Sequence, residues 1–213
     1  MALFDLDGTL TRRDTLTQYV VGFLARHPWR ALCLPLALPA LSRFLLGRGD
    51  RGELKAAFLK SVLGPLTRAE LAGWTQAFVA QVTERGLFDD ARAALARHRD
   101  RGDTLALLSA SPDLYVPALG AALGIPDVTC TGLAWRDDRL SGGLVTANRR
   151  GTEKVRCLEA LRQRYPGRAV TAYGNAASDL AHLRLAEHGV LVNGTARARR
   201  AAAELNIDRV SWR

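Results

Sequence analysis

Hydrophobic residues follow two different patterns along this chain of 213 residues. From about residue 89 onward, short continuous apolar runs alternate with stretches whose apolar residues recur at helical spacing. Continuous runs are typical of strands buried on both faces of a parallel sheet, and their alternation with helices predicts a doubly wound α/β sheet. The expected strands are the run that opens the chain at 2–4 and those at 104–109, 128–131, 169–173 and 189–193, with a last short one before Trp212.

Between the first strand and residue 88 the pattern is helical throughout. Apolar residues within 16–24 share one helical face, and Asp14 is placed to cap the start of that helix. A second helix is expected at about 53–62, and Thr67 with Glu70 forms the capping-box pattern that opens a third. The sequence therefore predicts a parallel α/β core with an inserted all-helical cap domain. The core comprises residues 1–11 and 88–213, with a β-hairpin expected at 133–145, and the cap comprises residues 12–87.

The segment 32–46 is more apolar than a small cap needs for its own core. It is too short, and too broken by Pro35, Pro39 and Arg43, for a membrane-spanning helix. An apolar body with cationic ends is the profile of a segment that lies in a lipid interface. A helical hairpin buried inside the insert explains the same pattern equally well, so both interpretations stay open. The flanking basic residues are Arg26, Arg30, Arg48 and Arg51.

The chain carries a net charge of +9, of which +6 falls in residues 12–87, where there are eleven Lys and Arg against five Asp and Glu. Such a charge favours anionic partners, either a membrane surface or a polyanion. Nucleic acid is not expected, because the basic residues lack an interleaved aromatic platform or a reading helix. The three cysteines, Cys33, Cys130 and Cys157, form neither a disulfide framework nor a metal-ligand pattern. With no signal peptide evident before the first strand, we expect a reducing, cytoplasmic location.

Two carboxylates close the first strand. Asp5 and Asp7 are one residue apart, so on a strand both side chains point to the same side and both can face one ion. Gly8 lets the backbone turn sharply after them and leaves room for a ligand against the main chain. A carboxylate nucleophile beside a second carboxylate, with Mg²⁺ reducing their repulsion and binding a phosphate, fits this layout. A polar turn after a strand would explain a bare Asp-x-Asp, whereas the longer string FDLDGTLT is far more specific.

That string, residues 4–11, resembles the first motif of the haloacid dehalogenase-like (HAD) phosphatases. The other family motifs have matches in the same order: Ser109 at the end of an apolar strand, Lys154 early in a helix, and the loop 173–179 after another strand. The strand-end residues fall where ligands bind in open α/β sheets, outside the carboxyl ends of the strands. The chain is most similar to the phosphoserine-phosphatase-like branch, subfamily IB, which inserts a helical cap just after the first strand of a Rossmann-like core.

The resemblance implies a Mg²⁺-dependent phosphomonoester hydrolase that works through an aspartyl phosphate. Asp5 would be the nucleophile, and Asp7 would be the general acid and then the general base. Ser109 would donate to a phosphoryl oxygen, and Lys154 would neutralise phosphate charge and hold Asp5 ionised. The resemblance further implies Gly8, Thr9, Ala110 and Asp14 as substrate-binding residues, and Asp5, Asp7, Asn175 and Asp179 as residues of the metal site.

The fourth motif departs from the common family pattern at Asn175. The family usually has Gly-Asp where this chain has Gly174-Asn175. An Asn carbonyl oxygen can ligate Mg²⁺ but brings no charge, so weaker ion affinity is expected unless Asp179 compensates. One alternative is therefore a basic lipid- or polyanion-binding protein that kept the fold with weak catalysis, although the intact aspartate pair argues against it.

The substrate is left open between two classes. The apolar, proline-broken and cationic cap favours a lipid-linked phosphate, with peripheral contact between the cap and an anionic membrane. A soluble phosphatase for a small metabolite such as phosphoserine is the alternative. Asp14 lies where phosphoserine phosphatases carry an acidic residue that meets the amino group of the substrate, but a helix-capping role explains Asp14 as well. Transfer of the phosphoryl group to an alcohol instead of water also stays open.

Overall fold

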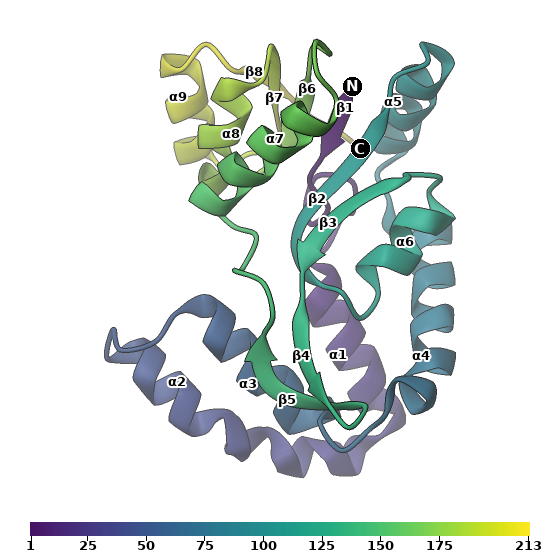
Figure 1. Cartoon of the computed structure of the whole chain (residues 1–213), viewed down its shortest axis with the longest axis vertical. Coiled ribbons are helices and arrows are strands. Elements are labelled where there is room, and N and C mark those ends of the chain that lie inside the picture. The colour runs from purple at the N-terminus through teal and green to yellow at the C-terminus, as the bar shows by residue number, and fades with distance from the viewer.

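The computed structural model of the chain describes all 213 residues and contains one six-stranded parallel sheet in the order β3–β2–β1–β6–β7–β8 (Figure 1). Strand β1 lies at the centre, paired with β2 on one side and β6 on the other, so that Leu3 is opposite both Ala106 and Ala172. The predicted doubly wound α/β fold is confirmed. The strands are β1 Ala2–Phe4, β2 Leu105–Pro112, β3 Asp127–Thr131, β6 Thr171–Gly174, β7 His188–Val192 and β8 Asp208–Val210.

Alternate residues of the central strands supply two hydrophobic cores, one on each face of the sheet. Phe4 and Leu107 belong to the core beneath α5 (Asp89–Asp100) and α6 (Val116–Ala122). Leu3 and Leu108 belong to the opposite core, beneath α7 (Thr152–Arg164), α8 (Leu180–Leu185) and α9 (Ala196–Glu204). Figure 1 shows α7, α8 and α9 on one side of the sheet and α5 and α6 on the other. Burial on both faces explains why the strands read as continuous apolar runs.

Between Thr15 and Gly86 the chain forms only helices, separated by His27 and by short loops at 46–50 and 64–67. Both predicted caps are confirmed. The Asp14 carboxylate accepts a hydrogen bond from the Thr17 amide at 2.7 Å, and Thr67 with Glu70 forms the complete capping box. The helices are α1 Thr15–Arg26, a 3₁₀ segment η1 Pro28–Ala37, α2 Leu38–Leu45, α3 Arg51–Leu63, α4 Arg68–Gln81 and a π-helical turn η2 Val82–Gly86.

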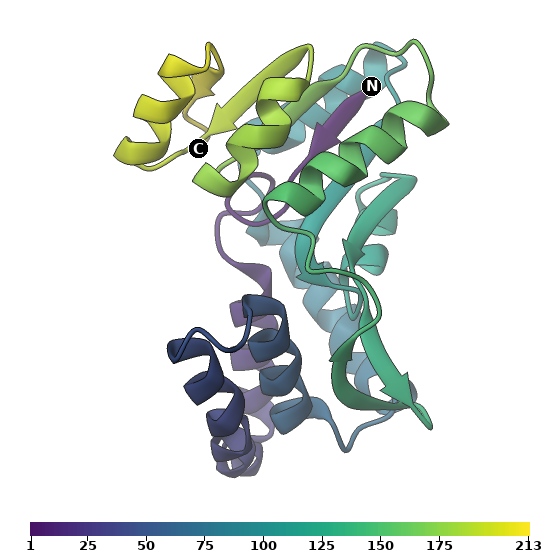
Figure 2. The same cartoon turned by 60° about the vertical axis from the view of Figure 1, so that its left-hand side comes forward.

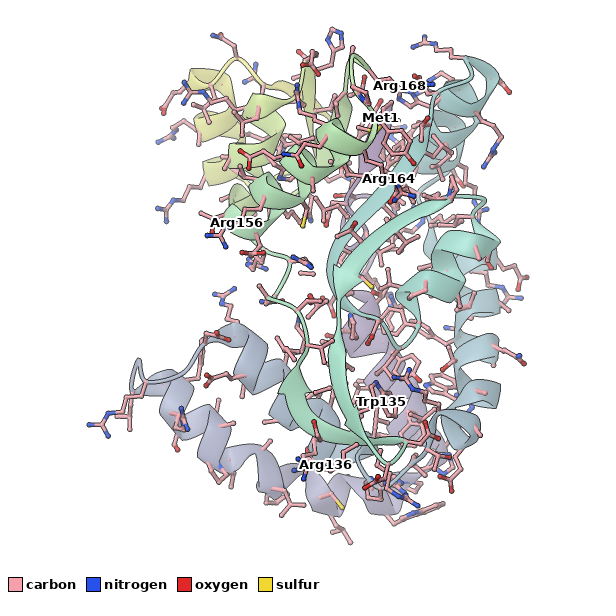
Figure 3. The ribbon with its side chains drawn as sticks, viewed as in Figure 1. Met1, Trp135, Arg136, Arg156, Arg164 and Arg168 are labelled. Carbon is pink, nitrogen blue, oxygen red and sulfur yellow. The ribbon has the colours of Figure 1, made fainter.

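The expected β-hairpin is present as β4 (Leu133–Arg136) and β5 (Arg139–Leu144), and it packs against α3. Figures 2 and 3 show it extending from the sheet down beside the first three helices, with Trp135 at the end of the molecule opposite Met1. The Arg68 guanidinium lies 4.0 Å from the centre of a Trp135 ring, which ties the hairpin to the start of α4. A segment outside residues 12–87 therefore packs on the cap helices, and the division of the chain at residues 11 and 88 stays a prediction.

Residues 28–46, called the apolar arm here, lie at the edge of the molecule, away from the sheet (Figure 1). The interpretation that buries this segment inside the insert is wrong, because α2 has no buried residue and Leu32 is 83% exposed. No helix combines the length and the apolarity needed to cross a bilayer. The large side chains exposed on the arm are Trp29, Leu32, Leu36, Leu38, Leu41, Leu45 and Leu46.

Candidate active site

The end of β1 holds Asp5 in a buried turn with both carboxylate oxygens hydrogen-bonded. Lys154 Nζ donates to Oδ1 at 2.6 Å, and Thr9 Oγ1 donates to Oδ2 at 3.0 Å. The turn brings Thr9 back because Gly8 has φ of +77° and because the Leu6 carbonyl accepts the amide of Thr9 at 3.2 Å. Asp5 is thus fixed in one orientation by a cation and a hydroxyl.

Lys154, in the first turn of α7, lies between two carboxylates and is almost fully buried. Its Nζ also donates to Asp179 Oδ1 at 2.8 Å. Burial alone would lower the pKa of Lys154, but the charges of Asp5 and Asp179 outweigh it and raise that pKa, so the ammonium is kept. Burial raises the pKa of Asp5 to about 6 against the opposing effect of Lys154, which leaves Asp5 ionised at neutral pH.

Asp7 is held by hydroxyl and amide groups instead of a cation. The amide and hydroxyl of Thr15 each donate to Oδ1 at 2.6 Å, and Ser111 Oγ donates to Oδ2 at 2.6 Å. Tyr115 shares a 3.0 Å hydrogen bond with the same Thr15 hydroxyl. Burial raises the pKa of Asp7, and these hydrogen bonds oppose it only in part. The two aspartates therefore differ in their partners: Asp5 is paired with an ammonium, whereas Asp7 accepts only from neutral hydroxyl and amide groups.

The loop after β6 is organised by Asp179, the last residue of the 3₁₀ turn η3 (Ala177–Asp179). Asp179 Oδ2 accepts the amides of Asn175 at 3.1 Å and Ala176 at 3.0 Å, while Oδ1 accepts from Lys154. Although burial alone would raise the pKa of Asp179, the Lys154 ammonium lowers it. Both oxygens are thus engaged within the protein, and Asp179 shapes the loop and positions the lysine. Its place in the metal site stays a prediction.

Asn175 lies directly against the turn that follows Asp5. A Cβ atom on Gly8 would come within 2.0 Å of the Asn175 side-chain amide nitrogen, so only glycine permits this approach. The juxtaposition brings an amide group, the Asp5 carboxylate and the Asp7 backbone into one cavity. Mg²⁺ in phosphoryl-transfer sites commonly takes one or two carboxylates and completes its shell with water and phosphate.

The chain has no cluster of three or more Asp, Glu, His or Cys side chains suited to a metal ion. The available donors are therefore the carboxylates of Asp5 and Asp179, the amide oxygen of Asn175 and the backbone carbonyl of Asp7. The Asp7 carbonyl accepts no hydrogen bond from the protein, which leaves it free as a ligand. This oxygen-only set fits Mg²⁺, and Asn175 brings no formal charge to it.

The catalytic cavity encloses about 150 Å³ above these side chains. Most of the predicted site residues line it, whereas Gly8, Thr9 and Ser109 do not. The Ser109 hydroxyl is fully buried and accepts the Ser111 amide at 3.0 Å, so its predicted contact with a phosphoryl oxygen stays a prediction. The lining residues predicted from the sequence are Asp5, Asp7, Asp14, Ala110, Lys154, Asn175 and Asp179.

Four further residues at the site were not predicted: Thr15, Lys55, Ser111 and Arg150. Ser111 had a signal, since it lies two positions after Ser109 on the same strand and so on the same side. Lys55 comes from α3, far along the chain, and donates to the Ala110 carbonyl at 2.5 Å and to Asn148 Oδ1 at 2.7 Å. Burial lowers the pKa of Lys55 to about 8. The cavity is therefore lined by the cations Lys55 and Arg150 as well as by Lys154.

A carboxylate paired with a buried lysine, next to a second carboxylate at the carboxyl edge of a parallel sheet, is an arrangement suited to a hydrolase. Residues 2–184 match the family model of haloacid dehalogenase-like hydrolases, and the chain belongs to that family. The predicted family resemblance and the predicted enzyme class, a hydrolase of this family, are thereby confirmed.

Individual relatives sharpen the assignment. The chain is 33% identical over 190 residues to Protein CicA of Caulobacter vibrioides, an alignment that covers 88% of this chain and 83% of CicA. It is 26% identical over 208 residues to Phosphoserine phosphatase SerB1 of Mycobacterium tuberculosis, covering 95% of this chain and 68% of SerB1.

Two solved structures share the fold. One is a Bordetella pertussis protein described as of unknown function, with a TM-score of 0.82, 23% identity and coverage of 99% of this chain and 97% of that one. The other is a phosphoserine phosphatase solved as a phospho-aspartyl intermediate analogue, with a TM-score of 0.66, 15% identity and coverage of 98% and 90%. At these identities the likenesses establish the fold.

Proposed function

We propose that the chain is a Mg²⁺-dependent phosphomonoesterase that forms an aspartyl phosphate on Asp5. The observation that carries this proposal is the difference between the two aspartates in one small cavity. Asp5 is paired with the Lys154 ammonium at 2.6 Å, whereas Asp7 is bound only by hydroxyl and amide donors. One suits a nucleophile and the other suits a proton carrier.

In the first step an Asp5 carboxylate oxygen attacks phosphorus, and the bond from phosphorus to the ester oxygen breaks. Asp7 gives its proton to that departing oxygen, which leaves as an alcohol. In the second step Asp7, now a carboxylate, takes a proton from a water molecule that attacks the aspartyl phosphate. The acyl phosphate bond breaks, inorganic phosphate is released, and Asp5 and Asp7 return to their starting states.

Positive charge around the phosphoryl group lowers the barrier to both steps. Lys154, Lys55 and Arg150 supply it, and all three line the cavity. Mg²⁺, held by Asp5, the Asp7 carbonyl and Asn175, would add charge to the phosphoryl oxygens and reduce the repulsion between phosphate and Asp5. Asp179 acts through Lys154 and the loop amides as a positioning residue.

The test is release of phosphate from a chromogenic phosphomonoester, with and without Mg²⁺, by the wild type and by Asp5→Asn. We expect metal-dependent turnover that falls by on the order of 10⁴-fold or more in the variant, since the nucleophile is lost. Asp100→Asn, at an exposed position on α5, is the matched control and should retain wild-type turnover. Turnover by Asp5→Asn at the wild-type rate would refute the proposal.

The substrate class that the surface favours is a lipid-linked phosphate met at an anionic membrane. The apolar arm exposes large side chains, including Trp29 and Leu36, next to basic residues such as Arg43. Apolar area together with positive charge favours binding to an anionic lipid interface. Charge on the surface is not confined to this end, however: Figure 3 places Arg164 and Arg168 near Met1, at the far end of the sheet.

Co-sedimentation with vesicles of anionic phospholipid tests this substrate class. Trp29→Asp combined with Leu36→Asp should reduce the bound fraction by about tenfold. Two apolar side chains that would enter the lipid are lost, and negative charge is added. Leu185→Asp, at an exposed leucine on α8, is the control and should reduce binding much less. Equal loss in both variants, or no binding at low salt, would favour a small metabolite as the substrate.

A further inference from the structure

An open apolar groove adjoins the catalytic cavity on the side of the arm. It encloses about 480 Å³, a volume within the range of small-molecule binding sites. Seven of its nine lining residues are hydrophobic, and they come from α1, η1, α2 and α3. The groove is lined by Leu16, Leu34, Ala37, Leu38, Leu41, Arg51, Leu54, Lys55 and Phe58.

The groove and the catalytic cavity share two of their lining residues, Leu16 and Lys55. Lys55 places its ammonium 2.5 Å from the Ala110 carbonyl beside the catalytic cavity, while its hydrocarbon stem is part of the groove wall. Leu16 directly follows Thr15, whose amide and hydroxyl bind the proposed general acid Asp7. The groove thus begins next to the residue that binds the proposed general acid.

A larger hollow of about 760 Å³ lies between the arm, α3 and the hairpin. It shares no lining residue with the catalytic cavity, and most of its fourteen lining residues are not hydrophobic. An apolar group attached to a phosphate in the active site would therefore enter the smaller groove and not the larger hollow.

We infer that this groove binds the hydrocarbon chain of the substrate, so that the substrate is a phosphomonoester of an alcohol carrying a long apolar chain. The inference rests on the proposed phosphatase function and names the substrate of that same site. In this binding mode the phosphate of the substrate contacts Asp5. Lys55 lies between the polar cavity and the apolar groove, and the hydrocarbon chain packs against the leucines of the groove. Transfer of a chain from water to such walls is favourable roughly in proportion to the area that it buries.

The test measures binding of alkylphosphonates with methyl, butyl and octyl chains, in the presence of Mg²⁺, by isothermal titration calorimetry below their critical micelle concentrations. These probes keep a phosphate-like head but have no ester bond to hydrolyse. We expect affinity to rise about tenfold or more from butyl to octyl, since each buried methylene contributes severalfold. Leu41→Asn, in the groove, should weaken octylphosphonate about fivefold and leave methylphosphonate unchanged.

Leu45→Asn is the matched control, since Leu45 is on the same helix and 74% exposed but does not line the groove. It should leave both ligands unchanged. Affinity that does not depend on chain length would overturn the inference, and so would equal weakening by Leu41→Asn and Leu45→Asn, which indicates adsorption to the outer surface of the arm. Because binding is measured without turnover, these results are separate from a failure of phosphatase activity, which the chromogenic ester reports.

Discussion

The buried charge cluster of the catalytic cavity, made of Asp5, Lys154 and Asp179 and called the floor here, and the apolar arm are built in opposite ways. On the floor all three side chains are buried, and the Lys154 ammonium lies within 2.8 Å of both carboxylates. On the arm, α2 buries none of its residues and Leu45 is 74% exposed. A buried charge cluster is stable only when it is complete, whereas an exposed apolar surface tolerates substitution of any one residue.

This contrast separates reaction chemistry from substrate choice. Changes on the floor should affect stability and turnover together, because the charges that perform the chemistry also compensate one another in the folded state. Changes on the arm should affect which substrate binds and leave the chemical steps intact. Lys55 and Asp14 line the catalytic cavity between the floor and the apolar arm. Substitutions of these two residues therefore show whether they affect the chemical steps or the choice of substrate.

The largest effect is expected from Lys154→Met, which breaks the floor. It leaves the carboxylates of Asp5 and Asp179 buried without their shared cation, and removing one partner from a buried pair costs about 3–5 kcal/mol. Urea denaturation at neutral pH should therefore show a loss of this size in the free energy of unfolding. Lys60→Met, at an exposed lysine of α3, is the control. If Lys154→Met lowers the free energy of unfolding no more than Lys60→Met does, the account is contradicted.

The next largest effect is expected from Asn175→Asp, which adds charge to the floor. A carboxylate in place of the amide should tighten Mg²⁺ binding by on the order of tenfold, since ligand charge sets affinity for hard cations. In metal-free protein the same change should lower stability, because a further carboxylate then joins Asp5, Asp7 and Asp179 in the cavity. Calorimetric Mg²⁺ titration and metal-free denaturation measure the two effects, and an unchanged Mg²⁺ affinity would place the ion elsewhere.

Lys55 predicts a pH dependence at the border between the two regions. Its ammonium loses the proton as pH rises through about 8, because burial lowers its pKa. The charged form favours a bound phosphate, so KM for a phosphomonoester should be lowest below that pH and should rise by about tenfold above it. Steady-state kinetics measures this rise. Lys55→Met should have the high KM at every pH. If KM still rises with pH in this variant as it does in the wild type, the titrating group is not Lys55.

The smallest effect is expected at Asp14, which caps α1 and also lines the cavity. If capping is its whole role, Asp14→Ala should cost about 1 kcal/mol of stability, and Asp14→Asn should cost little because asparagine caps equally well. KM for phosphoserine and for an alkyl phosphate should then be unchanged in Asp14→Asn. A rise in KM for phosphoserine alone would instead show that the carboxylate meets a substrate amino group and would favour the small-metabolite alternative.

The sequence predicts the sheet and the residues of the floor because both depend on local patterns. Asp5 and Asp7 share a strand end, and Lys154 and Asn175 follow elements whose order along the chain fixes their place at one edge of the sheet. Asp14 and Thr67 cap their helices through contacts only three residues away. Such patterns are visible in a linear sequence.

The arm and the cavity walls depend on tertiary packing, which local patterns do not specify. An apolar helix has the same sequence pattern whether it is buried or exposed, so the sequence does not distinguish the two interpretations of residues 32–46, whereas the structure shows α2 exposed. Lys55 reaches Ala110 across 55 positions, and no spacing rule predicts that contact. The buried orientation of Ser109 depends on its hydrogen bond to the Ser111 amide, which is a feature of how β2 ends.

The most direct test of the account is acid quenching during turnover of a phosphomonoester with Mg²⁺, followed by proteolysis and mass spectrometry. The account predicts one phosphoryl group on the peptide that contains Asp5, and none on that peptide in Asp5→Asn. Hydrolase activity in the wild type with no phosphorylated peptide, or with the phosphoryl group on a different residue, would contradict it.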